Sequence, residues 1–564
     1  MPKVIGIGKQ RYDRIIENNL FYIDKTMFIK EWWENQDDVT LITRPRRFGK
    51  TLNMDMLKCF FSNEYKDRGD LFEGLDIWKE EKYREIQGTY PVIFLSFAKI
   101  KQNTYEDAVA GIKRIICDEI QKYIFLKDWD GLAEEEKTNL KNITYGMDDV
   151  TAQEAIASLS NYLSRYYGKN VIILLDEYDT PMQEAYVNGY WKELVSFTRS
   201  FFNATFKSNL YLERAVITGI TRVSKESMFS DLNNLKVITV ESDEYSDTFG
   251  FSEEEVFLAL DDFNLSDKKQ IVKEWYDGFT FGSQRDIYNP WSIINFLENK
   301  KIDTYWADTS SNSLINHLIK KSVPEIKELM ELLLKRESIE VTFDDQIVFN
   351  QLDKSKNAIW SLLVASGYLK IDDIEYKGLL LKPWYHISIT NLETVSMFAN
   401  MFAGWFENPD ARYNDFIKSL LNNDLKGMNY YMNKVALATF SYFDTGKNPS
   451  ETLEPERFYH GFVLGLIVEL SDRYEVKSNR ESGFGRYDVM IIPLDKSEKA
   501  IVLEFKVHEN DEEKTLEETV SSALAQIEEK KYDTELINAG VKKENIRHYG
   551  FAFEGKKVLI GTDE

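Results

Sequence analysis

The stretch "VTLITRPRRFGKTLNMDMLKCFF" (39–61) places the strongest constraint on how this chain folds. A β-branched run leads into a loop that contains glycine, and a helix-forming run follows, so we expect a strand, a tight loop and a helix. Gly49, Lys50 and Thr51 stand where the loop meets the helix. Backbone N–H groups and the positive end of a helix attract phosphate oxygens at such a point. The stretch therefore predicts an α/β sheet with an anion-binding loop.

Four further apolar runs extend this sheet along the first 250 residues. They are "YPVIFLSF" (90–97), "NVIILLDEYD" (170–179), "RAVITGI" (214–220) and "KVITVE" (236–241), with helix-like segments such as 104–126 and 151–167 between them. Strands that alternate with helices favour a parallel sheet. The strands of such a sheet are buried on both faces and read as continuous apolar runs, as these do. We predict a parallel α/β domain over residues 1–250.

The pattern changes twice more along the chain. From residue 251 it becomes helical, and "NAIWSLLVASGYLKID" (357–372) predicts a helix that leads into a β-wing. After about residue 411 a new block begins with helices, continues with "YDVMIIP" and "AIVLEFKV", and ends with an acidic helix near 511–531 and "YGFAFEGKKVLIG". We expect a middle region over 251–410 and a separate α/β domain over 411–564, since 564 residues are too many for one core.

Composition narrows the classes of function. A net charge of −24 opposes nucleic-acid binding by the whole surface, although a local basic cleft remains compatible with it. Two cysteines provide no disulfide framework and no zinc cluster. The start "MPKVIGIGKQRYDR" lacks the apolar core of a signal peptide, and no run approaches the length of a membrane span. We expect a soluble cytoplasmic protein that makes no contact with a membrane.

The loop at 44–51 has partners further along the chain. Lys50 would reach the β- and γ-phosphates of a nucleotide, and Thr51 would offer its hydroxyl to Mg²⁺. Asp176, at the end of an apolar strand, would hold the same ion, while Glu177 would polarise the attacking water. Arg222, beyond the next strand, would stabilise charge in the transition state. The residues expected to line the nucleotide in addition to Lys50, Thr51 and Asp176 are Arg46, Arg47, Phe48 and Gly49.

Each of these assignments has a plainer alternative. The loop could be a basic surface turn, because Arg44 stands where the pattern G-x-x-x-x-G-K-[ST] has its first glycine. Asp176 and Glu177 could cap a helix, and Arg222 could form a surface salt bridge. The order of the strands along the chain favours a nucleotide site. A negative φ angle at Arg44 would let the loop do without that glycine.

A second set of charged residues lies on two strands near the end of the chain. Glu504 and Lys506 are two residues apart in "LEFK", so they share one strand face and Phe505 takes the other. A hairpin would bring Asp488 to the same face. Two carboxylates would hold Mg²⁺, with Glu469 from the preceding apolar helix as a third ligand, and Lys506 would activate water. A ladder of surface ion pairs is the alternative.

Several motifs together resemble a known family. "FYIDKTMFIK", "RPRRFGKT", "LLDEYDTP", "TGITRVSKESMFSDLNN" and "YNPWSIINFL" are similar to motifs of bacterial proteins that join an AAA-ATPase-like domain to a C-terminal PD-(D/E)XK nuclease-like domain. The resemblance implies a P-loop ATPase core, a helical lid with a winged-helix-like part, and a restriction-endonuclease-like α/β domain. Tyr487 stands where that nuclease motif has its proline.

The resemblance also implies what the chain would bind. ATP and Mg²⁺ are the expected cofactors, and nucleic acid, DNA or RNA, is the expected substrate of the second domain. The alternative is a nucleotide-dependent switch whose C-terminal domain binds a partner or nucleic acid without cleavage. Assembly into a homo-oligomer stays open.

Overall fold

The computed structural model forms two compact units, and each is described here by itself. The first combines Met1–Leu318 with Ser338–Thr394, and the second combines Ile319–Glu337 with Val395–Glu564. The residues that the structure describes are 2–221, 229, 232–306, 315, 318, 324–334, 336–343, 357–398, 414–439, 463, 467, 470, 473–482, 485–508, 514–554 and 557–563. The expected division into three parts stays a prediction.

A parallel sheet of five strands is the centre of the first unit. Its strands are β1 (Val39–Thr43), β2 (Val92–Ser96), β3 (Val171–Asp176), β4 (Leu212–Gly219) and β5 (Leu235–Ile238), in the order β2-β3-β4-β1-β5. All residues of β1 and β3 are buried, which agrees with the continuous apolar runs in the sequence. The predicted parallel α/β sheet is confirmed. The strand order places β4 between β1, which leads into the phosphate-loop candidate at 44–51, and β3, which ends at Asp176.

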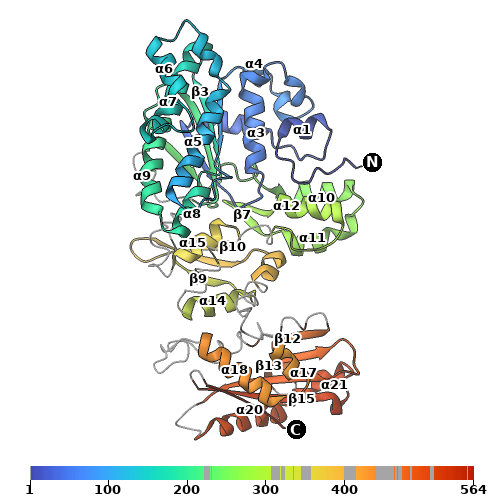
Figure 1. The fold of residues 1–564 in the computed structure, drawn as a ribbon. Coiled ribbons are helices and arrows are strands. Elements are labelled where there is room, and N and C mark those ends of the chain that lie inside the picture. The colour runs from blue at the N-terminus through green and yellow to red at the C-terminus, as the bar shows by residue number, and fades with distance from the viewer. Residues whose placement is uncertain are drawn as a thin grey trace. The chain divides into compact units, whose positions relative to one another are not determined.

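Helices cover both faces of this sheet, and Figure 1 shows it between α3 on one side and α7 and α9 on the other. The helices of this part are α1 (Tyr12–Glu17), α2 (Met27–Asn35), α3 (Lys50–Phe61), α4 (Glu81–Ile86), α5 (Tyr105–Gln121), α6 (Glu134–Asn142), α7 (Asp149–Tyr167), α8 (Thr180–Asn188) and α9 (Trp191–Phe202). Helix α7 begins where Asp148 accepts a hydrogen bond from the N–H of Thr151 at 2.9 Å, as an N-cap does.

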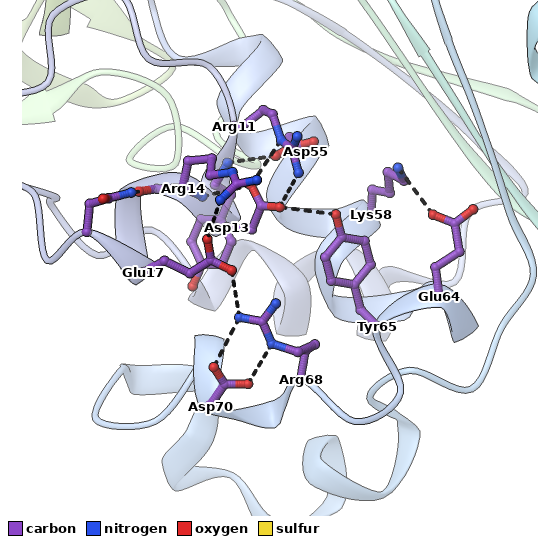
Figure 2. A network of polar contacts seen from close by, with 12 residues as sticks. Arg11, Asp13, Arg14, Glu17, Asp55, Lys58, Glu64, Tyr65, Arg68 and Asp70 are labelled. Atoms are coloured by element: carbon purple, nitrogen blue, oxygen red, sulfur yellow. Dashed lines mark hydrogen bonds and ion pairs between the residues drawn. The ribbon is translucent and has the colours of Figure 1, made fainter.

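Polar contacts fix helix α3, which begins at the phosphate loop, against the short helix α1 (Figure 2). Asp55 of α3 accepts a hydrogen bond from the N–H of Tyr12 at 2.6 Å, so it satisfies a free donor at the start of α1. Asp13 of α1 accepts from the hydroxyl of Tyr65 at 3.4 Å, just beyond α3. The middle of α3 and the segment just beyond it therefore have supports apart from those at the loop.

The rest of the first unit consists of smaller elements that follow the parallel sheet. One three-stranded sheet contains β6 (Phe251–Ser252), β7 (Phe279–Phe281) and β8 (Gln284–Tyr288), beside α10 (Glu253–Asp262), α11 (Lys269–Tyr276) and α12 (Pro290–Asn299). A second contains β9 (Ile339–Val341), β10 (Leu369–Lys377) and β11 (Lys382–Ile389), preceded by α15 (Ala358–Ala365). The predicted helix followed by a wing is present as α15 and the β10–β11 hairpin.

The second unit contains a mixed sheet of five strands in sequential order. The strands are β12 (Tyr474–Ser482), β13 (Gly485–Pro493), β14 (Ala500–Val507), β15 (Ile546–Glu554) and β16 (Lys557–Thr562), and the helices are α14 (Pro324–Leu334), α17 (Asn414–Leu421), α18 (Leu425–Thr439), α20 (Leu516–Lys530) and α21 (Asp533–Asn538). Only β14 and β15 pair in parallel, and α20 lies in the crossover between them, as a parallel pair requires.

Two cores flank this mixed sheet, one on each face. Alternate residues of β14 separate between them, with Leu503 and Phe505 in one core and Val502 in the other. Helices α17 and α18 supply the first core, and α20 and α21 supply the second. Of the apolar stretch 458–470, the structure describes Val463, Ile467 and Leu470, which join the first core. No helix within the described ranges combines the length and hydropathy needed to cross a bilayer.

One histidine of the second unit lies between two carboxylates. His548 of β15 is 2.7 Å from Asp533 through Nε2 and 2.5 Å from Asp563 through Nδ1. Burial lowers the pKa of His548, but the hydrogen bonds to Asp533 and Asp563 outweigh it and raise the pKa to about 9. The imidazolium therefore links α21 to the segment after β16 at neutral pH.

The titration of His548 predicts how stability depends on pH. Because its pKa is higher in the folded chain than in the unfolded chain, its contribution is complete below pH about 6.5 and is lost as the pH rises through about 9. We expect His548→Gln to destabilise the second unit by about 2 kcal/mol at pH 6 and far less at pH 10. Urea unfolding of both proteins at the two pH values measures this difference. A constant difference would contradict the assignment.

Candidate functional site

The phosphate-loop candidate joins the end of β1 to the start of α3. Gly49 precedes the first helical residue with φ of 81°, and Arg47 has φ of 66°. Two left-handed residues so close together turn successive N–H groups toward one side, and such a concave backbone binds anions. The free N–H groups of the first turn of α3 add to it. The predicted strand, loop and helix are all present.

Lys50 lies with its side chain folded back over the loop. Its ammonium donates hydrogen bonds to the carbonyl oxygens of Arg44 at 2.9 Å and Pro45 at 2.7 Å, and the residue is 5% exposed. Burial lowers the pKa of Lys50, while the charges of Glu177, Asp176 and Asp179 oppose that shift. A phosphate group would offer this ammonium charged acceptors, which bind more strongly than neutral carbonyls.

Two hydroxyl groups hold the carboxylate of Asp176 at the end of β3. Thr51 donates to one oxygen at 2.8 Å, and Thr218 of the neighbouring strand β4 donates to the other at 2.6 Å. Asp176 is fully buried; this burial raises its pKa, and the hydrogen bond from Thr218 opposes the rise. A threonine hydroxyl next to a carboxylate matches the oxygen ligands that Mg²⁺ prefers. The hydroxyl of Thr51 and the carboxylate of Asp176, which are 125 residues apart in the sequence, are therefore in direct contact.

Glu177 leaves the strand in a different direction from Asp176. Its φ of 52° is left-handed, which ends β3 and turns the side chain away from the alternation of the strand. Its carboxylate is partly exposed and accepts a hydrogen bond from the hydroxyl of Thr180 at 3.1 Å. A carboxylate in this position, one residue beyond Asp176, has the acceptor capacity that a general base needs.

Arg44 takes the place of the first glycine of the loop, and its side chain points into the protein interior. The guanidinium donates to the carbonyl oxygens of Thr43 at 3.0 Å, Thr239 at 2.7 Å and Tyr245 at 3.3 Å. It also lies 4.4 Å from the ring centroid of Phe281, a distance typical of a cation–π contact. The φ angle of Arg44 is negative, so this position does not require glycine.

The charge of Arg44 survives its burial. Burial lowers the pKa of Arg44 to about 9, and the carboxylate of Glu31 opposes this shift. The side chain is therefore a cation at neutral pH, and it is 0% exposed. Two of its carbonyl partners, Thr239 and Tyr245, belong to the segment that follows β5, so Arg44 connects the start of the loop to that segment. The departure from the glycine pattern is structural and leaves the nucleotide side of the loop open.

Two more loop residues attach the loop to neighbouring elements. Phe48 is 1% exposed, with its ring centroid 4.8 Å from that of Phe279 and 5.5 Å from that of Phe281. Pro45 lies against Gly367, where an added Cβ would come within 2.8 Å of the proline ring. The side chain of Phe48, expected to line a nucleotide, is thus part of the core, and only its backbone remains for a phosphate.

The two remaining loop arginines contact neighbouring helices. Arg46 donates to the side-chain oxygen of Gln183 in α8 at 3.2 Å. Arg47 lies over the ring of Trp291 in α12, with 4.4 Å between its guanidinium carbon and the ring centroid. Asn289, the N-cap of α12, donates to the backbone oxygen of Arg46 at 3.3 Å. Both guanidinium groups therefore stay beside the loop without joining the core.

The loop that leaves β4 is fixed by an aspartate that the sequence did not single out. Asp179 is 1% exposed and accepts hydrogen bonds from the N–H groups of Ile220 at 3.0 Å and Thr221 at 2.9 Å. The motif "LLDEYDTP" contains it, but its partners lie about 40 residues further on. Arg222, the next predicted residue, lies outside the described residues.

The second predicted site lies on the sheet of the second unit. Strands β13 and β14 are antiparallel, and Val489 lies opposite Leu503. The next pair in this register is Asp488 and Glu504, and both lie on the face of the sheet that α20 covers. Asp488 accepts from the N–H of Phe505 at 2.8 Å. Phe505 itself points to the opposite core, as its position in "LEFK" predicts. Glu469, predicted as a further ligand, lies outside the described residues.

Helix α20 provides the contacts to this acidic pair. Gln526 donates a hydrogen bond to Glu504, which is 2% exposed, and Lys506 donates to the hydroxyl of Ser522 at 3.2 Å. Burial and the charges of Glu504 and Asp488 raise the pKa of the nearby Tyr532 to about 12. Two carboxylates and a lysine therefore share one face, which is the donor set that a hard divalent cation and a phosphodiester would engage.

The comparisons with known proteins agree with the two expected kinds of domain. Residues 6–229 match a family model described as predicted AAA-ATPase, and residues 454–563 match one described as the PD-(D/E)XK nuclease superfamily. A protein of Azotobacter chroococcum mcd 1, described as an uncharacterized protein in the vnfD 5′ region, is 24% identical over 504 residues, 87% of each chain. These two segments are thus similar to an AAA-ATPase-like domain and a PD-(D/E)XK nuclease-like domain, in the order that the resemblance predicted.

The buried position of Arg44 yields a test of the loop. Arg44→Gly restores the sequence pattern but leaves several buried carbonyl oxygens without a donor, so we expect a loss of about 3 kcal/mol of stability. Arg47→Gly is the matched control, because its left-handed φ favours glycine and the change should cost less than about 1 kcal/mol. Urea unfolding compares the two variants. Equal stabilities would show that Arg44 does not anchor the loop.

Proposed function

We propose that the first unit binds ATP with Mg²⁺ and hydrolyses it. The hydrogen bonds that join Thr51, Asp176 and Thr218 beside Lys50 carry this proposal, since they bring together the groups that a nucleotide and its metal need. Lys50 binds the β- and γ-phosphates, and Thr51 and Asp176 hold the cation. When bound, Mg²⁺ neutralises charge on the β- and γ-phosphate oxygens.

The hydrolytic step follows from Glu177. Its carboxylate accepts a proton from water as that water attacks the γ-phosphorus, and the bond to the bridging oxygen of ADP breaks. The products are ADP and inorganic phosphate. Arg222, two residues after Ile220 in the sequence, is the proposed cation for transition-state charge. Arg46, Arg47 and the backbone of Phe48 and Gly49 complete the phosphate site.

We further propose that the second unit is a Mg²⁺-dependent phosphodiesterase acting on nucleic acid. The presence of Asp488, Glu504 and Lys506 on one face under α20 carries this proposal. The two carboxylates, with Glu469 as a third ligand, hold the cation, which lowers the pKa of bound water when present. Lys506 orients the attacking water and faces the charge that develops on the phosphodiester. DNA and RNA both present that group.

One observation favours a second function for this unit. Glu504 is 2% exposed and hydrogen-bonded to Gln526, so a ligand must compete with α20 for it. A nucleotide-dependent switch that binds nucleic acid or a protein partner without cleavage would leave this contact intact. Self-association into a homo-oligomer is compatible with either function.

The ATPase assignment predicts different effects for two substitutions. Lys50→Ala should abolish both ATP binding and turnover, because the ammonium is the proposed ligand of the β- and γ-phosphates. Glu177→Gln should leave binding intact and lower kcat about a hundredfold, because it removes the general base alone. Lys141→Ala, an exposed lysine of α6, is the control. Phosphate release and nucleotide titration measure the two effects, and turnover in Lys50→Ala equal to that of the wild type would refute the site.

The nuclease assignment predicts cleavage that needs both the acidic residue and the lysine. With Mg²⁺ and mixed single- and double-stranded DNA and RNA, we expect cleavage that is lost with chelator, Asp488→Ala or Lys506→Ala. Lys543→Ala, an exposed lysine of the same unit, should behave as the wild type. Gel electrophoresis with and without ATP provides the readout. Undiminished cleavage by both active-site variants would contradict the nuclease assignment. Nucleotide-dependent binding of nucleic acid or a protein partner without cleavage would support the switch.

A further inference from the structure

A chain of hydrogen bonds connects the phosphate loop to the loop that leaves β4. Arg46 donates to the side-chain oxygen of Gln183 at 3.2 Å, and the nitrogen of the same amide donates to Asp179 at 3.1 Å. Asp179 in turn accepts from the N–H of Ile220 and from both the N–H and the hydroxyl of Thr221. One side-chain amide therefore joins two loops that come from different strands.

Asp179 has the properties of a residue that sets position. It stands directly before α8, yet its side chain makes no capping bond to that helix. One carboxylate oxygen instead accepts all four hydrogen bonds, within 2.9–3.1 Å, and the residue is 1% exposed. Tyr178 adds a bond from its hydroxyl to the carbonyl of Thr221 at 2.7 Å. The strand-end loop of β4 is thus held from both its N–H and its C=O groups.

The same loop is tied to the start of the phosphate loop. The N–H of Arg44 donates to the carbonyl of Gly219 at 3.1 Å. Gly219 must be glycine, because an added Cβ would lie 2.6 Å from the ring of Tyr178 and 2.8 Å from a carboxylate oxygen of Asp179. Since these backbone contacts are fixed, the contact between Arg46 and Gln183 is the part of the chain that a ligand can exchange.

The position of Arg46 indicates which ligand would exchange it. Gln183 holds the guanidinium on the side of α8, the helix that follows the strand end of Asp176 and Glu177. The γ-phosphate is attacked by the water molecule that Glu177 deprotonates, so it must lie on that side. An amide oxygen is a neutral acceptor, and a phosphate oxygen is a charged one that binds guanidinium more strongly. The γ-phosphate of ATP would therefore displace the side-chain oxygen of Gln183 as the hydrogen-bond acceptor of Arg46.

We propose that Gln183 is a latch on Arg46 that ATP opens and ADP does not, with Asp179 as the positioning residue that holds Gln183 and the β4 loop. This inference rests on the proposed binding of ATP at the phosphate loop. It makes Gln183 a determinant of the preference for the triphosphate. It also links the γ-phosphate to the segment that continues into Arg222.

Two substitutions of Gln183 should change nucleotide affinity in opposite directions. Gln183→Glu gives Arg46 a charged partner that competes with phosphate, so we expect the Kd for ATPγS to rise about tenfold. Gln183→Ala removes the competing acceptor and should lower that Kd about threefold. The Kd for ADP should change less than about twofold in both variants, since ADP lacks the γ-phosphate for which Gln183 competes. Asn188→Asp adds the same charge at the exposed end of α8 and is the control.

Calorimetric titration of the full chain with Mg²⁺ and either ATPγS or ADP measures these constants, and steady-state turnover adds Asp179→Asn, which should lower kcat more than it changes KM. If Gln183 served only for folding, both of its variants would bind ATPγS and ADP more weakly by the same factor. Shifts of the ATPγS constant in one direction, or equal shifts for ATPγS and ADP, overturn the latch while the ATP site stands. Wild-type protein that binds neither nucleotide overturns the proposed function itself.

Discussion

The carboxylate of Asp176, held between Thr51 and Thr218, is the contact on which the arrangement of the first unit depends. It joins the first turn of α3 to two neighbouring strands, so the helix, the acidic strand and β4 share one point. The parallel order β3-β4-β1 makes this possible, because all three strands end at the same edge of the sheet. Every other group of the proposed nucleotide site lies within a few residues of those three strand ends.

Around that point, side-chain contacts fix the phosphate loop, which has Arg44 where the common pattern has a flexible glycine. Arg44 and Phe48 enter the core on opposite ends of the loop, while Arg46 and Arg47 stay beside it. A loop fixed in this way has little conformational entropy left to lose when a phosphate binds. The cost is a buried cation that needs several carbonyl partners, and two of these come from the segment after β5. Binding competence and the stability of that segment are therefore coupled.

The sequence allowed the sheet and the position of several candidate residues on it to be predicted, because both depend on local pattern. Strands buried on both faces read as apolar runs, and a spacing of two put Glu504 and Lys506 on one face. Contacts set by the order of the strands were not readable. The partners of Asp179 follow from β4 lying next to β3, and the carbonyl partners of Arg44 follow from the course of the chain after β5. Asn289 and Gln183 contact the loop only because α12 and α8 begin there.

The central claim is that phosphate binds on the side of Lys50 and Thr51 while Arg44 stays in the core. A crystal structure with Mg²⁺ and a non-hydrolysable ATP analogue tests it most directly. We expect the ammonium of Lys50 to leave the carbonyl oxygens of Arg44 and Pro45 for the β- and γ-phosphates. We also expect the guanidinium of Arg44 to keep its bonds to Thr239 and Tyr245. An Arg44 side chain turned out onto the phosphates, or a nucleotide bound away from Lys50, would contradict the account.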